Sequence, residues 1–221
     1  MSEPHALLML SCAKGIRPDA LVDAMADAAG EGAHFATILP EEALPALAHA
    51  ENLVQGLPDV LATVKPERAV ATLDAAGDLI DRGQSTILAF ERHAILPGRD
   101  AIRLYFGLRR LPHLSREAFH DYWLNRHAEI GRRLIPPYSY HQLHARGNET
   151  ARLASETGLA ASTLDGVVEV HFPDTDAFTR QLSRPEVAQE ALEDEKNFID
   201  HDRSQFWGYA ERPVSGSRAK G

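Results

Sequence analysis

The chain has 221 residues, of which 44% are hydrophobic and 25% charged, and its formal net charge is −9 at pH 7. This composition is typical of a globular protein with a sizeable core, and the acidity argues against nucleic acid as a partner, because phosphate binding needs clustered Lys and Arg. Cys12 is the only cysteine, so no intrachain disulfide can form and we expect a cytoplasmic protein. We also expect no secretion signal and no membrane span, since no apolar run approaches ~20 residues.

The first half alternates short apolar runs with helical patterns. Four apolar runs predict strands at 6–13, 33–39, 59–64 and 85–92. Helical spacing predicts a helix that begins at Pro18 and another over 67–81, which Gly83 ends. The Ala- and Leu-rich segment 41–54 predicts a further helix.

The same order of elements begins again after a linker at 95–100. Apolar runs predict strands at 101–110, 138–146, 164–172 and 204–211. Ser115 is a good N-cap for a helix over 115–134, and a second helix is expected from Asp176 to about Asn197, with a break at Pro185. The segment 147–162 is predicted to be a looser excursion.

Strand–helix–strand, used twice in each half, is the ferredoxin-like plan. The predicted fold class is α+β, with tandem ferredoxin-like repeats that form an intrachain dimeric α/β-barrel, or pseudo-dimer. We expect a degenerate half at 1–97, a half that carries the site at 101–212 and a disordered tail at 213–221. Helices cover one face of each sheet, so the two bare faces can pack together; the pattern also leaves room for a homodimer.

Polar and aromatic side chains gather on one face of the predicted strands of the second half. Alternation along the strands places on this face Arg103, Tyr105, Arg109, Tyr140, His144, Glu169, His171, Trp207 and Tyr209. The face is either a solvated outer surface or the lining of a cleft between two sheets. We favour the cleft, because aromatic side chains with polar tips suit a half-dry cavity. The assignment of faces is less clear for 138–146.

Two histidines of the helix over 115–134 lie beside its apolar stripe. With about 100° per residue, Phe119, Trp123 and Leu134 share one side of the helix, and His120 and His127 flank it. Such an imidazole is either a satisfied core group or a general acid or base. HxH and HExxH patterns are absent from the sequence, so we expect no metal site.

Three stretches of the second half carry a more specific pattern. They are IRLYFGLRRLPHLSREAFHDYWLNRHAEI from Ile102, LDGVVEVHF from Leu164 and EKNFIDHDRSQFWGYAE from Glu195. Over residues 101–212 they resemble the EthD family of dimeric α/β-barrel proteins. The matching positions are Ser115, Phe119, Tyr122, Trp123, His127, Ala128, Asp165, Gly166, Phe198, Asp200 and Ser204.

The resemblance implies a ferredoxin-like barrel with a cleft for a small hydrophobic molecule, and it places the family's recurrent His and Asp on His127 and Asp200. Members with known activities are largely cofactor-free lyases, isomerases and polyketide dehydratases or cyclases. We therefore expect a cofactor-independent acid–base enzyme of the lyase, dehydratase or isomerase type, acting on an aromatic or cyclic oxygenated substrate.

Each candidate residue has an expected role. His127 would act as base or acid, Asp200 would orient an imidazole or a loop, and Tyr140 and His144 would hold a substrate oxygen. The expected substrate-binding residues are Arg103, Tyr105, Arg109, Trp123, Glu169, His171, Trp207 and Tyr209.

Two other functions compete with an enzyme. The first is a non-catalytic binder of an apolar ligand or of haem, with His144 or His171 as the axial ligand. The second is a scaffold or assembly protein, against which the polar and aromatic face argues.

Overall fold

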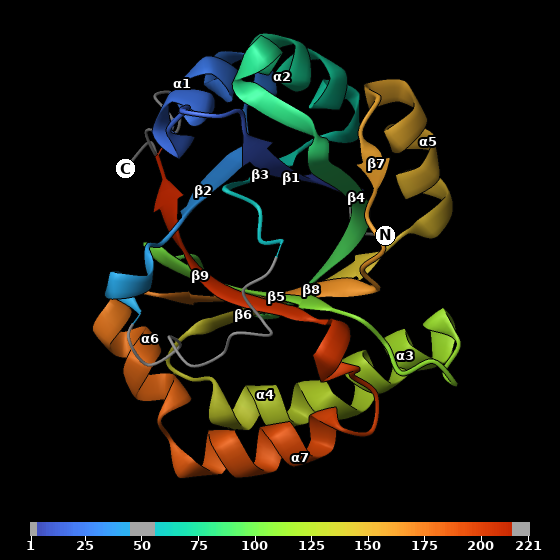
Figure 1. Cartoon of the computed structure of the whole chain (residues 1–221). Coiled ribbons are helices and arrows are strands. Elements are labelled where there is room, and N and C mark those ends of the chain that lie inside the picture. Colours follow the sequence, from blue (N-terminus) through green and yellow to red (C-terminus); the bar gives the residue numbers. More distant parts are fainter. Residues whose placement is uncertain (1–3, 45–55, 214–221) are drawn as a thin grey trace.

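The computed structural model describes residues 4–44 and 56–213, and in this part of the chain eight antiparallel strands close into a barrel (Figure 1). Around the ring the order is β1, β3, β2, β9, β5, β8, β6 and β4, and β4 pairs with β1 to close it. The strands of the first half are His5–Cys12 (β1), His34–Ile38 (β2), Val60–Val64 (β3) and Ile80–Leu96 (β4). Those of the second half are Ile102–Leu108 (β5), Ser139–Ala145 (β6), Gly166–Phe172 (β8) and Gln205–Arg212 (β9).

The ring contains the same strand order twice. It runs β4, β1, β3, β2 through the first half and β9, β5, β8, β6 through the second. The halves meet where β2 pairs with β9 and where β4 pairs with β6, both antiparallel. Closure leaves the ring without a free edge, because every one of its strands has two neighbours.

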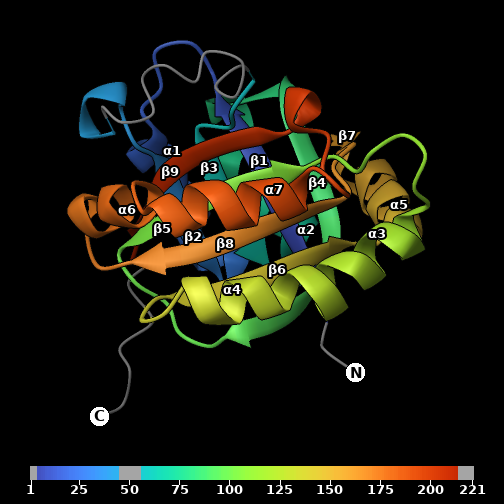
Figure 2. The ribbon, with the colours of Figure 1, turned by 90° about the horizontal axis from the view of Figure 1, so that it is seen from below.

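Helices cover the barrel from outside on two opposite sides (Figure 1). The first half contributes Pro18–Ala29 (α1) and Ala69–Ala76 (α2). The second half contributes Arg116–Tyr122 (α3), Ala128–Leu134 (α4), Thr175–Leu182 (α6) and Leu192–Glu195 (α7). Seen from below, α4 and α7 lie across the strands of the second half (Figure 2). None of the described helices is long and apolar enough to cross a membrane.

Side chains from the two halves pack together inside the barrel. Leu7, Met9 and Leu61 from the first half belong to one buried cluster with Tyr105 and Trp207 from the second. The indole N–H of Trp207 donates to the carbonyl of Leu39 at 2.7 Å, and the hydroxyl of Tyr209 donates to the carbonyl of Pro58 at 2.8 Å. The polar tips of these aromatic side chains therefore connect the second half to backbone of the first.

All eight predicted strands are present, but the predictions for 67–81 and 147–162 were wrong, and β4 extends to Leu96, into the linker expected at 95–100. The helix expected over 67–81 ends at Ala76, and Gly83 lies within β4. The reason is Gly77, whose φ of +52° ends the helix before a short 3₁₀ turn, Gly77–Leu79. The excursion at 147–162 contains a regular helix, Gly147–Thr157 (α5), and the short strand Ala160–Ala161 (β7), which pairs with β4.

Two predicted segments fall partly or wholly outside the described residues. Of the helix expected over 41–54, the structure describes only a 3₁₀ turn, Glu41–Ala43. The tail expected to be disordered at 213–221 lies outside the described residues, except for its first residue.

Candidate active site

A cavity of about 440 Å³ lies between the sheet of the second half and its helices. Its floor consists of strand side chains on the helix-facing side of the sheet, among them Leu104, Phe106 and Val170. Its walls come from α4, α6 and α7 with the segment before α7, so apolar side chains line most of it. This size and lining are typical of a small-molecule site.

Tyr140 forms part of the wall, and two hydrogen bonds to its hydroxyl hold it in place. Its hydroxyl accepts from the indole N–H of Trp123 at 3.1 Å and from Nε2 of Gln142 at 2.8 Å. Nε2 of Gln142 also donates to the carbonyl of Trp123 at 3.0 Å. Burial raises the pKa of Tyr140 above its usual range. Tyr140 is therefore a neutral, fixed wall of the cavity.

His127 is the residue of the predicted catalytic set that lines the cavity with a free imidazole nitrogen. It is 8% exposed, and its Nδ1 lies 2.7 Å from Oδ2 of Asp194. The other oxygen of Asp194 accepts from the hydroxyl of Tyr122 at 2.8 Å. A carboxylate at Nδ1 favours the N–H on that nitrogen, so Nε2 of the neutral imidazole is an acceptor for a molecule in the cavity.

A π-helical turn, Trp123–His127, explains why His127 is more buried than the sequence indicated. Such a turn inserts one residue into the helix, which rotates everything after it by about 100°. His127, predicted at the edge of the apolar stripe, thereby turns into the buried side, together with Ala128 and Gly131. Turns of this kind occur often at functional sites.

A second histidine of the cavity was missed by the sequence analysis. His201 begins the 3₁₀ turn His201–Arg203 before β9, and its Nε2 lies 2.9 Å from Oε2 of Glu195. Both residues line the cavity, and the His201 ring lies against Phe106. Asp194 and Glu195 were also missed, because the sequence of an acidic helix does not indicate which histidines its carboxylates will contact.

Asp200 holds the turn that carries His201. Its backbone N–H donates to the carbonyl of Arg109 at 2.7 Å, and its Oδ2 accepts from Nε of Arg203 at 2.6 Å. Of the two roles expected for Asp200, orienting a loop is the one that this geometry favours. The carboxylate that contacts His127 belongs to Asp194.

The predicted polar face is divided between the two sides of the sheet, so its expected composition was wrong. Register decides this: Ser139 pairs with His171, and His141 pairs with Glu169, so these four share one side of the sheet. Tyr140 and His144 alternate with Ser139 and His141 along β6, so they lie on the other side of the sheet, which faces the helices. The expected chamber between two sheets is therefore not where His127 lies.

Inside the barrel, three of the predicted residues, Arg103, Glu169 and His171, form a packed ionic cluster with Glu211. Arg103 donates through Nη1 to Glu169 at 2.8 Å and through Nε to Glu211 at 2.5 Å. Burial by itself would raise the pKa of Glu169, but the guanidinium groups of Arg103 and Arg92 lower it well below its usual range. Burial lowers the pKa of His171 to about 3, so that imidazole is neutral.

Arg109 lies apart from this cluster and from the His127 cavity. It borders a smaller cavity of about 190 Å³ with Met9 and Arg203, and its guanidinium donates to the hydroxyl of Thr163. The substrate-binding roles expected for Arg103, Arg109 and Glu169 therefore have no support from position.

His144 is stacked in a cluster of rings outside the cavity. Its ring centroid lies 4.7 Å from that of Trp123 and 4.4 Å from those of His120 and His93. Its Nε2–H donates to Oε1 of Gln142 at 2.9 Å. Neither His144 nor the fully buried His171 fits the axial haem ligand that the sequence suggested. Among the described residues, no group of three or more His, Cys, Asp or Glu is arranged to hold a metal ion.

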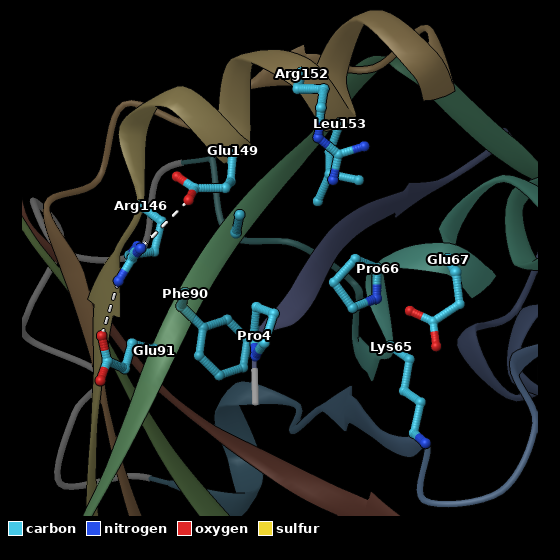
Figure 3. Close-up of a pocket in the computed structure, with 11 residues that line it drawn as sticks. Pro4, Lys65, Pro66, Glu67, Phe90, Glu91, Arg146, Glu149, Arg152 and Leu153 are labelled. Carbon is cyan, nitrogen blue, oxygen red and sulfur yellow. Dashed lines mark hydrogen bonds and ion pairs between the residues drawn. The ribbon is translucent and has the colours of Figure 1, made fainter. Parts of the chain in front are cut away.

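Another cavity, of about 490 Å³, lies where the halves meet beside α5 (Figure 3). Phe90 and Leu153 form its apolar surface, and charged side chains surround it. Arg146 is already paired with Glu91 at 2.9 Å and with Glu149 at 3.3 Å. No residue of the predicted site lines this cavity, so the His127 cavity is the candidate active site.

The closed antiparallel barrel with outer helices defines an α+β protein of the dimeric α/β-barrel class. Solved structures of this architecture match nearly the whole chain. An anthrone oxidase-like protein matches with a TM-score of 0.60 and 10% identity, over 100% of this chain and 97% of its own. A monooxygenase candidate from Lactobacillus acidophilus NCFM gives 0.52 and 6%, over 96% and 94% of the two chains. A mutant chlorite dismutase from Candidatus Nitrospira defluvii gives 0.52 and 10%, over 97% and 93%.

Within this class, residues 111–202 match the family model of the EthD domain. This match, over less than half of the chain, confirms the resemblance found in the sequence. The match includes His127, Asp194, Glu195 and His201. The search of curated proteins found no match.

Proposed function

We propose that the chain is a cofactor-independent acid–base enzyme whose substrate is a small hydrophobic, aromatic or cyclic oxygenated molecule held in the His127 cavity. The observation that carries this proposal is one imidazole in an apolar cavity, with Nδ1 fixed at 2.7 Å by Asp194 and Nε2 free. A lyase, dehydratase or isomerase would begin with the same step, which is removal of a proton beside a carbonyl group.

The surroundings of His127 support a role as a base. Asp194 fixes the tautomer and would stabilise the imidazolium that forms when Nε2 accepts a proton. The apolar lining limits the contact of His127 with water, which strengthens this interaction. Proton transfer by a positioned side chain contributes about 10²–10⁴-fold to a rate, which is sufficient for a substrate whose C–H bond is already activated.

The lining of the cavity supports the substrate class. Its volume of about 440 Å³ suits one small molecule, and Phe106, Phe172 and Phe206 offer aromatic surface. The name of one structural neighbour, an anthrone oxidase-like protein, agrees with an aromatic oxygenated ligand.

We further propose that the halves at 1–97 and 101–212 are tandem ferredoxin-like units that form a pseudo-dimer within one chain. The repeated strand order supports this, since corresponding strands occupy corresponding places in the ring. Association of whole chains into a homodimer stays a prediction.

The test is deuterium exchange at an activated C–H bond, which needs no knowledge of the natural reaction. Anthrone, 2-tetralone and 1,3-indanedione would be incubated with the protein in D₂O and followed by NMR. We expect exchange that His127→Ala lowers about 100-fold and Asp194→Asn lowers less, with unchanged circular dichroism. The exposed His113→Ala is the matched control. Equal exchange by wild type and His127→Ala would remove His127 from the mechanism, and binding without exchange would indicate a carrier of apolar ligands.

A further inference from the structure

We propose that Glu195 and His201 form a second acid–base pair in the His127 cavity, which gives a proton to the substrate oxygen while His127 takes one from carbon. This inference rests on the proposed function and extends it, because it assigns a proton donor to the same site. Neither residue belongs to the set expected from the sequence.

The geometry brings two imidazole–carboxylate pairs to one helix. Consecutive carboxylates of α7 contact different histidines: Asp194 contacts His127 at 2.7 Å, and Glu195 contacts His201 at 2.9 Å. The histidines come from segments far apart in the sequence, the π-helical turn before α4 and the 3₁₀ turn before β9. Both imidazoles line the same cavity.

The cavity wall has few other groups that can exchange a proton. Tyr140 is the remaining titratable residue of the lining, and its hydroxyl accepts from Trp123 and Gln142. Burial raises the pKa of Tyr140 above its usual range, so this hydroxyl keeps its proton, and His127, Glu195 and His201 are the side chains of the lining best suited to exchange protons with a bound molecule.

The two pairs differ in their contact with water. The side chain of His127 is 10% exposed, whereas that of His201 is 31% exposed. An ion pair with this much contact with water adds little to the stability of the fold, so folding alone gives weak reason for placing it in the cavity wall. Contact with water lets the pair regain a proton from solvent, which a donor needs after each turnover.

The step balances without an added reactant. The C–H bond breaks, its proton goes to Nε2 of His127, and its electron pair forms a C=C bond. The π pair of the carbonyl moves onto oxygen, which takes a proton from Nδ1 of His201 in its imidazolium form, so the ketone becomes its enol and His201 becomes a neutral imidazole that still bonds Glu195 through Nε2. Exchange with solvent returns the proton to the donor and removes it from His127.

Asp200 completes the arrangement as a positioning residue. It fixes the start of the His201 turn through its backbone bond to Arg109 and its carboxylate bond to Arg203. The ring of His201 is therefore held over Phe106 at the cavity wall.

The experiment measures exchange of 2-tetralone in D₂O and its pH profile for Glu195→Gln, His201→Gln and a control, Glu193→Gln. Glu193 lies on the same helix and pairs with Lys196 at the surface. We expect Glu195→Gln and His201→Gln each to lower the exchange rate about 10- to 100-fold. Each should also remove one ionisation from the pH dependence of that rate, whereas Glu193→Gln should keep the wild-type pH dependence. A second readout needs no turnover: added 2-tetralone should shift the imidazole NMR signals of both His127 and His201.

The outcomes separate this inference from the proposed function. If His127→Ala loses exchange while Glu195→Gln and His201→Gln keep the wild-type rate and profile, the second pair is refuted and the proposed function stands. If wild type itself shows no exchange and no shift of either imidazole, both fail. A shift of the His127 signals alone would also exclude His201 from the site.

Discussion

Acid should destabilise this fold, and His144 should account for a measurable part of the loss. The ring is 5% exposed and is enclosed by Trp123, His120 and His93. Burial and the two neighbouring imidazoles lower its pKa from 6.5 to about 2. The unfolded chain therefore binds a proton at this residue below pH 6.5, whereas the folded chain does not bind one until about pH 2.

The sign and size of the effect follow from proton linkage. Stability contributed by neutral His144 is fully present above pH 6.5 and is lost as the pH falls from 6.5 towards 2. Below pH 6.5 the free energy of unfolding should fall by up to about 1.4 kcal/mol per pH unit for this one group, which amounts to about 2 kcal/mol at pH 5.

Replacement by a ring that cannot titrate isolates this contribution. His144→Phe keeps a flat ring against Trp123 but loses the hydrogen bond to Gln142, which should cost about 1–3 kcal/mol at every pH. The readout is therefore the slope: between pH 6 and pH 5, the free energy of unfolding in urea should fall by about 1 kcal/mol less than in wild type. The exposed His113→Phe serves as control. If His144→Phe retains the wild-type slope, the imidazole is already protonated in the folded protein and the reasoning is wrong.

Three further substitutions test other parts of the structure. Glu169→Gln leaves the buried Arg103 with one carboxylate partner and should lower the free energy of unfolding in urea by about 3–5 kcal/mol; a loss below 1 kcal/mol would contradict a buried ion pair. A Cβ at Gly131 would lie 2.6 Å from a ring carbon of Tyr140, so Gly131→Ala should cost about 1–3 kcal/mol and weaken binding of 2-tetralone measured by NMR titration. Ser115→Ala removes the N-cap of α3 and should lower stability by about 1 kcal/mol without changing exchange, and a loss of activity at constant stability would count against a purely structural cap.

Local chemistry explains what could be predicted from the sequence. Apolar runs, Pro18 and Ser115 bound the elements through forces that act within a few residues, and those elements are found in the structure. The resemblance to the EthD family likewise depends on short motifs, and the family match at 111–202 confirms it. His127 could be found because it stands in one of these motifs beside an apolar stripe.

The tertiary structure decided which side chains meet. Tyr140 and His144 lie on the other face of the sheet from Glu169. Only the register in which β6 pairs with β8 decides this, because a shift of one residue would exchange the two faces of β6. The π-helical turn that buries His127, and the helix that brings Asp194 and Glu195 to two histidines, depend on packing between segments far apart in the chain. The sequence by itself therefore determined most of the elements and the resemblance to the EthD family. Long-range packing decided the location of the cavity and the partners of its histidines. The alternation of side chains along a strand or helix shows which residues share a face, but it does not show which face a distant segment of the chain will cover.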